Sequence, residues 1–272
     1  MQLPLCVVDA FTRERFRGNP AAVCLPGDTV SASWMQSVAA ELNLSETAFA
    51  TRSGAGRWHL RWFTPRTEVD LCGHATLATA HALWESGCEP LSQSLRFETR
   101  SGVLECHRED GPTESARIVM DFPAQPAQAT PPPPGLQEAL GAGAVWVGRS
   151  REDLLVEVAT AEAVRSLKPD FRALAPFPVR GIIVTARSDR PEADFVSRFF
   201  APAVGIDEDP VTGSAHCTLA GHWAERLGRP ALTGYQASAR GGTVGVELRG
   251  LRVRLLGHAI TAWRGQWSGP VG

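Results

Sequence analysis

Apolar and polar positions divide the chain into many short strands and a few helices. Short runs that are rich in β-branched or aromatic side chains predict strands. In the first half of the sequence these runs cover residues 3–10, 21–25, 44–49, 58–63, 95–106 and 116–122. In the second half they cover residues 144–148, 154–158, 181–185, 194–200, 234–239, 243–248, 251–255 and 259–267.

Other apolar positions recur with helical spacing. Residues 33–42 predict an amphipathic helix that ends at Asn43, because their apolar side chains share one face. Residues 74–84 carry Ala, Leu and Thr all round, and a helix that is apolar on every side is usually enclosed. With strands before and after it, the simplest arrangement is a helix wrapped by a strongly curved sheet. Further helices are expected at residues 136–140, 161–167 and 214–227.

One pattern of residues occurs twice. Residues 61–87 and residues 198–228 each contain a short aromatic strand, a turn with acidic residues, a small-residue switch and an apolar helix. The matching positions are Arg61/Arg198, Phe63/Phe200, Pro65/Pro202, Gly73-His74-Ala75/Gly213-Ser214-Ala215 and Ala80/Ala220. Small residues recur easily by chance, but here the aromatic, proline and glycine positions agree together. The repeat therefore predicts two similar halves.

The predicted fold class is α+β, with two pseudo-symmetric halves that each wrap a central helix in a curved sheet. We expect residues 1–122 to form the N-terminal half and residues 135–272 the C-terminal half, with the last strand able to pack back on the first half. Residues 123–134, PAQPAQATPPPP, separate them. Pro-rich segments are stiff and extended, so this one is expected to be a linker.

Composition and charge narrow the classes of function. With 272 residues and 43% hydrophobic content, the chain has room for a packed core. A net charge of −2 gives no basic surface for nucleic acid or an anionic membrane. The start resembles no signal peptide, and no run of about 20 apolar residues would span a bilayer. The six cysteines are scattered, which predicts reduced thiols and a cytoplasmic location.

Both copies of the repeat place a glycine where the enclosed helix should begin, Gly73 before His74 and Gly213 before Ser214. A helix start has free N–H groups and partial positive charge, so it attracts anions, and glycine lets a ligand approach the backbone. Two such starts that face each other would suit a carboxylate substrate. For either glycine alone, a tight strand-to-helix turn is the simpler interpretation; the matched pair favours the site.

Three side chains could carry acid–base chemistry. If residues 44–49 are extended, Glu46 lies between apolar neighbours, and burial would raise the pKa of its carboxyl group and make it a proton carrier. His74, at a helix start, would be held neutral by the helix dipole and could orient substrate or donate a hydrogen bond. Asp209 precedes a proline. The alternatives are a surface glutamate, a helix-cap histidine and an ordinary Asp-Pro turn.

Several motifs occur in an order that resembles the PhzF-like phenazine-biosynthesis isomerase family. They are GNPAAV at 18–23, NLSETAF at 43–49, RWFTP and LCGHATLA within 61–78, EDPVTGSAH at 208–216 and RGG at 240–242. The resemblance spans nearly the whole chain. Within the family, the chain is most similar to the phenazine-biosynthesis-like domain proteins that occur outside phenazine producers. It implies a diaminopimelate-epimerase-like fold, in which each half is a central helix in a barrel-like wrap and the site lies between the halves.

The resemblance also implies roles for particular residues. In the phenazine enzyme of this family, a glutamate of the NLSET motif moves a proton between two ring carbons, and by motif this glutamate is Glu46. The family's histidine falls on His74, and its aspartate and serine fall on Asp209 and Ser214; these residues position the substrate and the proton carrier. The backbone N–H groups implied to hold the substrate carboxylate are those of Gly73, His74, Gly213 and Ser214.

Such chemistry implies neither a cofactor nor a metal. No His/Cys cluster in the sequence has metal-ligand spacing, since His216 and His222 do not share a helix face. We therefore expect no metal site.

The related epimerases use two cysteines as bases, one from each half, and this chain departs from that pattern. Cys72 stands just before Gly73, near the place of one such cysteine, but the second half has Asp209-Pro210 in the corresponding region. Cys217 lies further on and is expected to face the core. A two-thiol epimerase is therefore disfavoured, and Cys72 is either a lone base or a small buried residue.

Two hypotheses of different classes follow. The first is a cofactor-independent isomerase that acts on a small carboxylate, with Glu46 as general acid/base. The second is a partner-binding protein that retains the isomerase fold without catalysis. The family resemblance also implies a homodimer.

Overall fold

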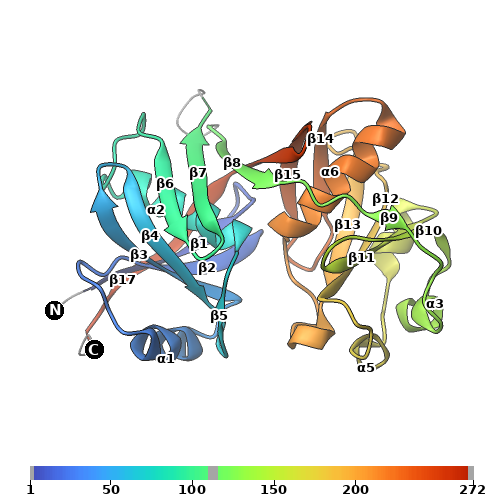
Figure 1. Cartoon of the computed structure of the whole chain (residues 1–272), viewed down its shortest axis with the longest axis horizontal. Helices are drawn as coiled ribbons and strands as arrows, with labels where there is room; N and C mark the ends of the chain where they lie inside the picture. The colour runs from blue at the N-terminus through green and yellow to red at the C-terminus, as the bar shows by residue number, and fades with distance from the viewer. Residues whose placement is uncertain (1–2, 110–115, 269–272) are drawn as a thin grey trace. The chain divides into compact units, whose positions relative to one another are not determined.

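The computed structural model describes residues 3–109 and 116–268. By its internal contacts the chain divides into two compact units: Met1–Asp121 together with Leu256–Gly272 form unit 1, and Phe122–Leu255 form unit 2. The chain leaves unit 1 within β8 (Ile118–Pro123) and returns to it within β16 (Arg252–Gly257) (Figure 1). The C-terminal strand thus belongs to the same unit as the N-terminal strand.

Unit 1 is a mixed sheet with two principal helices. Its strands pair in the order β17–β1–β2–β3–β4–β6–β7–β8, with β2–β3 and β4–β6 parallel. Its helices are α1 (Ala32–Leu42) and α2 (Gly73–Glu85). Its strands are β1 (Leu3–Ala10), β2 (Asn19–Cys24), β3 (Glu46–Gly54), β4 (Arg57–Phe63), β5 (Glu68–Val69), β6 (Leu95–Thr99), β7 (Gly102–Arg108) and β17 (Ala259–Trp267).

Unit 2 repeats this topology. Its strands pair in the order β9–β10–β11–β12–β13–β14–β15, with β11–β12 and β13–β14 parallel. Its helices are α3 (Leu136–Leu140), α4 (Ala161–Ser166), α5 (Phe171–Leu174), η1 (Pro202–Val204) and α6 (Gly213–Leu227). Its strands are β9 (Gln128–Ala129), β10 (Ala144–Arg149), β11 (Asp153–Val158), β12 (Gly181–Arg187), β13 (Phe195–Phe200), β14 (Ala231–Gln236) and β15 (Gly242–Arg249).

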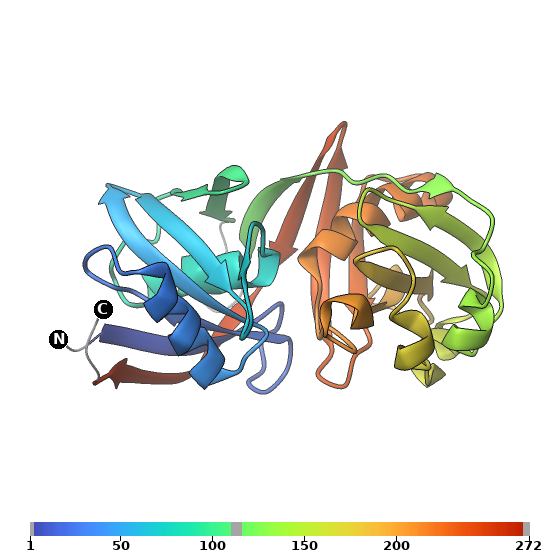
Figure 2. The ribbon, with the colours of Figure 1, turned by 60° about the horizontal axis from the view of Figure 1, so that its bottom comes forward.

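The central helices are α2 in unit 1 and α6 in unit 2. Ten of the 13 residues of α2 are buried, which an apolar helix needs when strands cover it on several sides. A second core in unit 1 is formed where Phe49 of β3 packs with Met35 and Val38 of α1. Figure 2 shows α1, in blue, lying along the strands of this unit. Side chains alternate along a strand, so Ala48 and Ala50 point away from Phe49, toward α2.

The repeat extends to side-chain contacts. Arg61 donates from Nε and Nη2 to the two carboxylate oxygens of Glu68 over 2.7 and 2.8 Å. Arg198 makes the same paired contacts with Glu208 over 2.7 and 2.8 Å. Bidentate pairs of this kind fix geometry well. Each one ties an aromatic strand to the acidic turn before the central helix, so the two copies are built alike.

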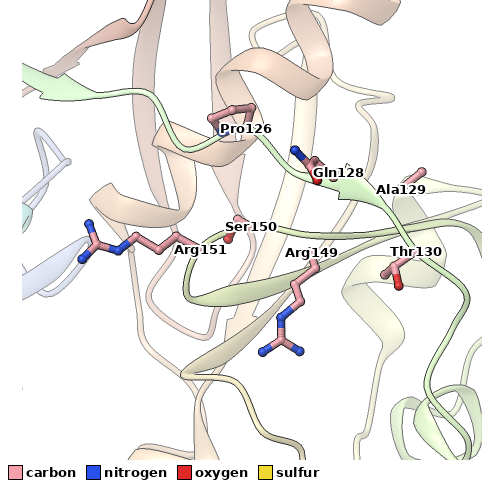
Figure 3. Close-up of a pocket in the computed structure, with 7 residues that line it drawn as sticks. All are labelled: Pro126, Gln128, Ala129, Thr130, Arg149, Ser150 and Arg151. Atoms are coloured by element: carbon pink, nitrogen blue, oxygen red, sulfur yellow. The ribbon is translucent and has the colours of Figure 1, made fainter.

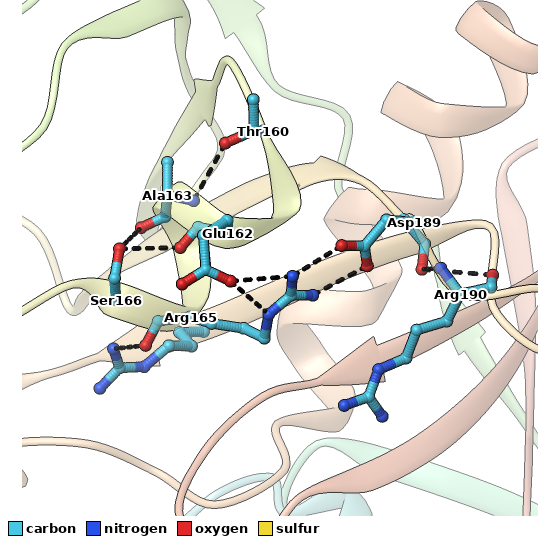
Figure 4. A network of polar contacts seen from close by, with 9 residues as sticks. Thr160, Glu162, Ala163, Arg165, Ser166, Asp189 and Arg190 are labelled. Atoms are coloured by element: carbon cyan, nitrogen blue, oxygen red, sulfur yellow. Dashed lines mark hydrogen bonds and ion pairs between the residues drawn. The ribbon is translucent and has the colours of Figure 1, made fainter.

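An ion network lies on the surface of unit 2 (Figure 4). Arg165 of α4 donates to Asp189 Oδ1 over 2.8 Å and Oδ2 over 2.6 Å, and its Nε donates to Glu162 Oε2 over 3.1 Å. Exposed ion pairs contribute little to stability. This one orients α4 against the turn that follows β12.

The Pro-rich segment, residues 123–134, contains a short strand. Residues 128 and 129 form β9, which pairs antiparallel with β10 at Gly148 and Arg149. Prolines at 126 and 131 flank these residues, and because proline cannot donate to a sheet, the strand stays short. The short elements β5, α5 and η1 also went unpredicted, and β3 begins at Glu46 rather than at residue 44.

Candidate active site

Glu46 and His74 come together in unit 1 from distant parts of the sequence. Glu46 is the first residue of β3, and His74 is the second residue of α2, whose N-cap is Cys72. His74 Nε2 lies 3.1 Å from Glu46 Oε2, and the side chains are only 6% and 13% exposed. The sequence predicted both residues as candidates, and the structure makes them neighbours.

The surroundings of Glu46 differ from the expected ones. Residues 44 and 45 form a bend, so the alternation that would have placed Glu46 between apolar neighbours does not apply. Its carboxylate instead faces His74 and Cys72. The buried Oε2 atom is the carboxylate oxygen that lies beside His74 Nε2.

Asn19 completes the contacts of the imidazole ring. This residue opens β2, is fully buried, and places Nδ2 3.1 Å from His74 Nδ1. A side-chain amide can present either its nitrogen or its oxygen, so Asn19 can serve a neutral or a protonated ring. In the sequence Asn19 stood out only as part of the GNPAAV motif, and the contact depends on β2 lying beside α2.

Cys72 lies on the other side of the ring. Its Sγ atom is 3.6 Å from His74 Nδ1 and 4.0 Å from Nε2, and the residue is 7% exposed. Burial raises the pKa of the Cys72 thiol, and the nearby Glu46 carboxylate raises it further, against smaller opposing effects of His74 and the Ala75 backbone N–H. Cys72 is therefore a protonated thiol at neutral pH.

The expectation that the helix start keeps His74 neutral is wrong in direction. Burial by itself lowers the pKa of His74, but the negative charge available at Cys72 and Glu46 and the contacts with both groups raise it well above its ordinary value. Both groups lie beside the ring, Cys72 Sγ at 3.6 Å from Nδ1 and Glu46 Oε2 at 3.1 Å from Nε2. The outcome is a buried imidazolium–carboxylate pair.

In unit 2, Asp209 belongs to a separate polar cluster. Thr212, the N-cap of α6, donates from Oγ1 to Asp209 Oδ2 over 2.5 Å. The fully buried Gln236 accepts from Thr212 N over 2.9 Å and donates to the Asp209 carbonyl oxygen over 2.7 Å. Gln236 thus fixes the turn that carries Asp209 to the start of α6. Nothing in the sequence pattern singled out Gln236 or Thr212.

The predicted helix starts are confirmed as elements. Gly73 is the first residue of α2 and Gly213 is the first residue of α6, with His74 and Ser214 second. The two N-caps, Cys72 and Thr212, make no side-chain hydrogen bond to the helix start. The convergence of the two starts on one carboxylate stays a prediction, because the two starts lie in different units.

The structure also groups donor atoms that the sequence spacing did not suggest. Glu46, Cys72 and His74 each offer one ligand atom, and these three atoms lie within 4.8 Å of one another. The expectation of no metal-ligand cluster considered only residues close in sequence, whereas here Glu46 comes from a different element. A thiol, an imidazole and a carboxylate are together a possible set of ligands for a transition metal.

A surface cavity in unit 2 contains none of the predicted site residues (Figure 3). It has a volume of about 440 Å³. Its lining residues are Pro126, Gln128, Ala129, Thr130, Arg149, Ser150 and Arg151. The side chains of Arg149 and Arg151 extend in different directions, and Arg149 donates to the Pro178 carbonyl oxygen over 2.8 Å. They do not form a converging anion site.

Across residues 3–109 and 116–268, the helices are all too short or too polar to cross a membrane.

Comparisons with known proteins give the family context. A family model described as phenazine biosynthesis-like protein (PhzC-PhzF) matches residues 8–265. A Pseudomonas aeruginosa protein named as an uncharacterized isomerase is 51% identical over 266 residues, which cover 98% of each chain. The crystal structure of a PhzF-family protein from Enterococcus faecalis is 40% identical, with a TM-score of 0.92 over 98% of this chain and 99% of that one.

A more distant solved structure bears on the fold alone. It is a hydroxyproline epimerase from Agrobacterium vitis, 10% identical, with a TM-score of 0.62 over 97% of this chain and 92% of that one. Together with the closer structure, it confirms the predicted α+β, epimerase-like fold.

Proposed function

Because the chain belongs to the PhzC-PhzF family of phenazine biosynthesis-like proteins, we propose that it is a cofactor-independent isomerase that moves a proton on a small carboxylate substrate. The isomerase class itself is supported by the names of the relatives that match nearly the whole chain. In this proposal Glu46 is the general acid/base: it takes a proton from one substrate carbon and returns it to another.

The observation that carries the proposal is the state of the Glu46 carboxylate. Its Oε2 atom is buried and lies 3.1 Å from His74 Nε2, so the carboxylate is held against the imidazole ring. A proton carrier has to be positioned within hydrogen-bond reach of the proton that it moves, and this contact would fix the orientation of the carboxylate.

His74 would position Glu46 and would compensate for the change in its charge. When Glu46 accepts a proton, the ring loses its anionic partner, and Asn19 still faces Nδ1 at 3.1 Å and holds the ring in place. The substrate carboxylate would bind at the start of α2, through the N–H groups at Gly73 and His74.

Exchange of substrate protons with D2O tests the proposal. The protein is incubated in D2O with a panel of small cyclic and amino-acid-like carboxylates, and deuterium incorporation is followed by NMR. We expect deuterium at a carbon adjacent to a carbonyl or an unsaturated group. Glu46→Gln should reduce the rate by at least about 100-fold, since general acid–base catalysis contributes roughly that much or more.

Glu41→Gln is the matched control, because Glu41 lies on the exposed side of α1 in the same unit. It should leave the exchange rate unchanged. Exchange that persists in Glu46→Gln would overturn the role of Glu46. If folded protein binds a partner and this binding is unaffected by Glu46→Gln, while the panel shows no exchange, the partner-binding alternative replaces the isomerase.

A further inference from the structure

We infer that Glu46, Cys72 and His74 form a binding site for a zinc-type divalent cation, and that occupation of this site blocks the proton carrier. Binding as such is independent of the proposed isomerase; the inhibition rests on it. The three residues come from the start of β3 and the start of α2, two elements that are well packed against each other through the core of unit 1.

The donor set selects the class of metal. Magnesium and calcium prefer oxygen ligands only, whereas thiolate, imidazole and carboxylate together are ligands of zinc and of cations that resemble it. Three protein ligands leave a fourth position open for water. The site therefore fits zinc, cobalt or cadmium better than the hard cations that are abundant in cells.

The distances are close to those of a tetrahedral site. Zinc bonds of about 2.0–2.2 Å to nitrogen and oxygen and about 2.3 Å to sulfur place ligand atoms roughly 3.3–3.6 Å apart. Here His74 Nε2 lies 3.1 Å from Glu46 Oε2 and 4.0 Å from Cys72 Sγ. The thiol and the carboxylate lie within 4.8 Å of each other, so side-chain rotation that brings these two donors closer would place all three on one ion.

Asn19 supplies the outer contact that a metal-bound histidine requires. With Nε2 on the metal, Nδ1 carries the remaining ring proton, and the Asn19 amide stands 3.1 Å away. With its oxygen turned to the ring, Asn19 accepts that proton in a hydrogen bond. Such partners fix the tautomer and orientation of a ligating histidine.

Charge and protons balance in the occupied site. The cation displaces the Cys72 thiol proton and the extra proton of His74, both of which pass to solvent. The bound state then holds one divalent cation, one thiolate, one carboxylate and one neutral imidazole, so its net charge is zero. A buried site without net charge avoids the cost of an unpaired ion.

Occupation would remove the atom on which the proposed reaction depends. Glu46 Oε2 cannot carry a proton while it ligates a cation, so metal and turnover exclude each other. Zinc should therefore act as a reversible inhibitor, relieved by a chelator, and not as a cofactor.

Cobalt binding provides a readout that needs no substrate. Full-length protein is freed of metal with a chelator, the chelator is removed, and Co²⁺ is titrated. We expect a thiolate-to-cobalt charge-transfer band in the near ultraviolet, visible bands typical of tetrahedral cobalt, and loss of both on addition of Zn²⁺. Cys72→Ser should abolish the charge-transfer band, and Asn19→Ala should weaken binding about 10- to 100-fold.

Cys217→Ser is the matched control, since Cys217 is also a buried cysteine but lies in unit 2, within α6. It should keep the band. Circular dichroism and thermal melting verify that each variant is folded, and Glu46→Gln gives a second test that leaves Cys72 intact: it should weaken Co²⁺ binding at least 10-fold.

A charge-transfer band that survives in folded Cys72→Ser, or no band at saturating Co²⁺, would overturn the inference. The proposed isomerase fails separately, through absence of deuterium exchange in metal-free protein. Exchange that is unaffected by zinc at concentrations that saturate the site would leave the site in place and overturn the inhibition.

Discussion

The charge on His74 depends on one neighbour more than on its place in the helix. A helix start favours a neutral or anionic group, because its free N–H groups carry partial positive charge. At His74 the Glu46 carboxylate, 3.1 Å from Nε2, outweighs this effect. A direct ionic contact in a buried site is stronger than a dipole whose charge is spread over a turn of helix.

The pKa of His74 should respond to Glu46 in a defined direction. We expect His74 to titrate above its ordinary value of 6.5 in the native protein and to titrate lower in Glu46→Gln, where only Cys72 is left of the two groups that offset burial. A raised folded-state pKa means that the pair stabilises the fold fully below pH 6.5, and that this contribution is lost as pH rises through the folded value.

Histidine NMR signals followed against pH measure this titration, with the His74 signal assigned by comparison with His74→Gln. A native pKa at or below 6.5, or an equal pKa in Glu46→Gln, would contradict the assignment of the ion pair. The same titration in Glu41→Gln should match that of the native protein, because Glu41 is exposed.

At the scale of elements, the two central helices begin in different ways. The start of α2 has Cys72 as N-cap and the Glu46–His74 pair beside it. The start of α6 has Thr212 as N-cap and is held by the last residue of β14, Gln236. The repeat thus conserves the backbone of the helix start and changes the side chains around it, so the two halves supply different chemistry.

Gln236→Leu should destabilise the protein by about 3 kcal/mol, because it leaves the Thr212 N–H and the Asp209 carbonyl oxygen buried without their partner. Denaturant unfolding measures the change. Gln128→Leu, an exposed glutamine in the same unit, should change stability by less than about 0.5 kcal/mol. Equal stabilities for Gln236→Leu and the native protein would show that the amide does not hold the turn.

Most elements could be predicted from the sequence because their signals are local. The helix at 33–42 has an apolar face and a stop at Asn43, which takes the left-handed conformation with φ 48°. The short strand β9 could not be predicted, since two residues among prolines carry no periodicity and depend on the edge of β10.

The site residues also divide into those that local motifs indicate and those that depend on contacts between distant segments. Glu46 and His74 were found because short motifs resemble those of a known family, whereas their contact requires β3 and the start of α2 to lie together. Asn19 and Gln236 act through contacts that span 55 and 24 residues of sequence. No local pattern shows which buried amide faces which helix start.

At the scale of the whole molecule, unit 1 takes an edge strand from the other end of the sequence. β17 pairs with β1 along its length, from Leu3 opposite Trp267 to Ala10 opposite Ala259, and in unit 2 β9 takes the corresponding place beside β10. Without β17, β1 would present an unpaired edge, which is a hazard for a sheet protein. The last strand therefore stabilises the first unit, although unit 2 precedes it in sequence.

Trp267→Ala should loosen unit 1 and leave unit 2 intact. The Trp267 ring packs edge-on against Trp34 of α1, with centroids 6.0 Å apart, in the core between α1 and the sheet. Losing this partly buried ring should cost about 2 kcal/mol, below the range for a fully buried tryptophan. In hydrogen exchange, amides of α1, β1 and β2 should lose protection while those of β11, β12 and β13 keep it.

Trp263→Ala is the control, because Trp263 is an exposed tryptophan on the same strand, and it should leave both sets of amides unchanged. Equal loss of protection in the two units would show that they unfold as one cooperative body, in which the strand supports the whole chain rather than unit 1 alone.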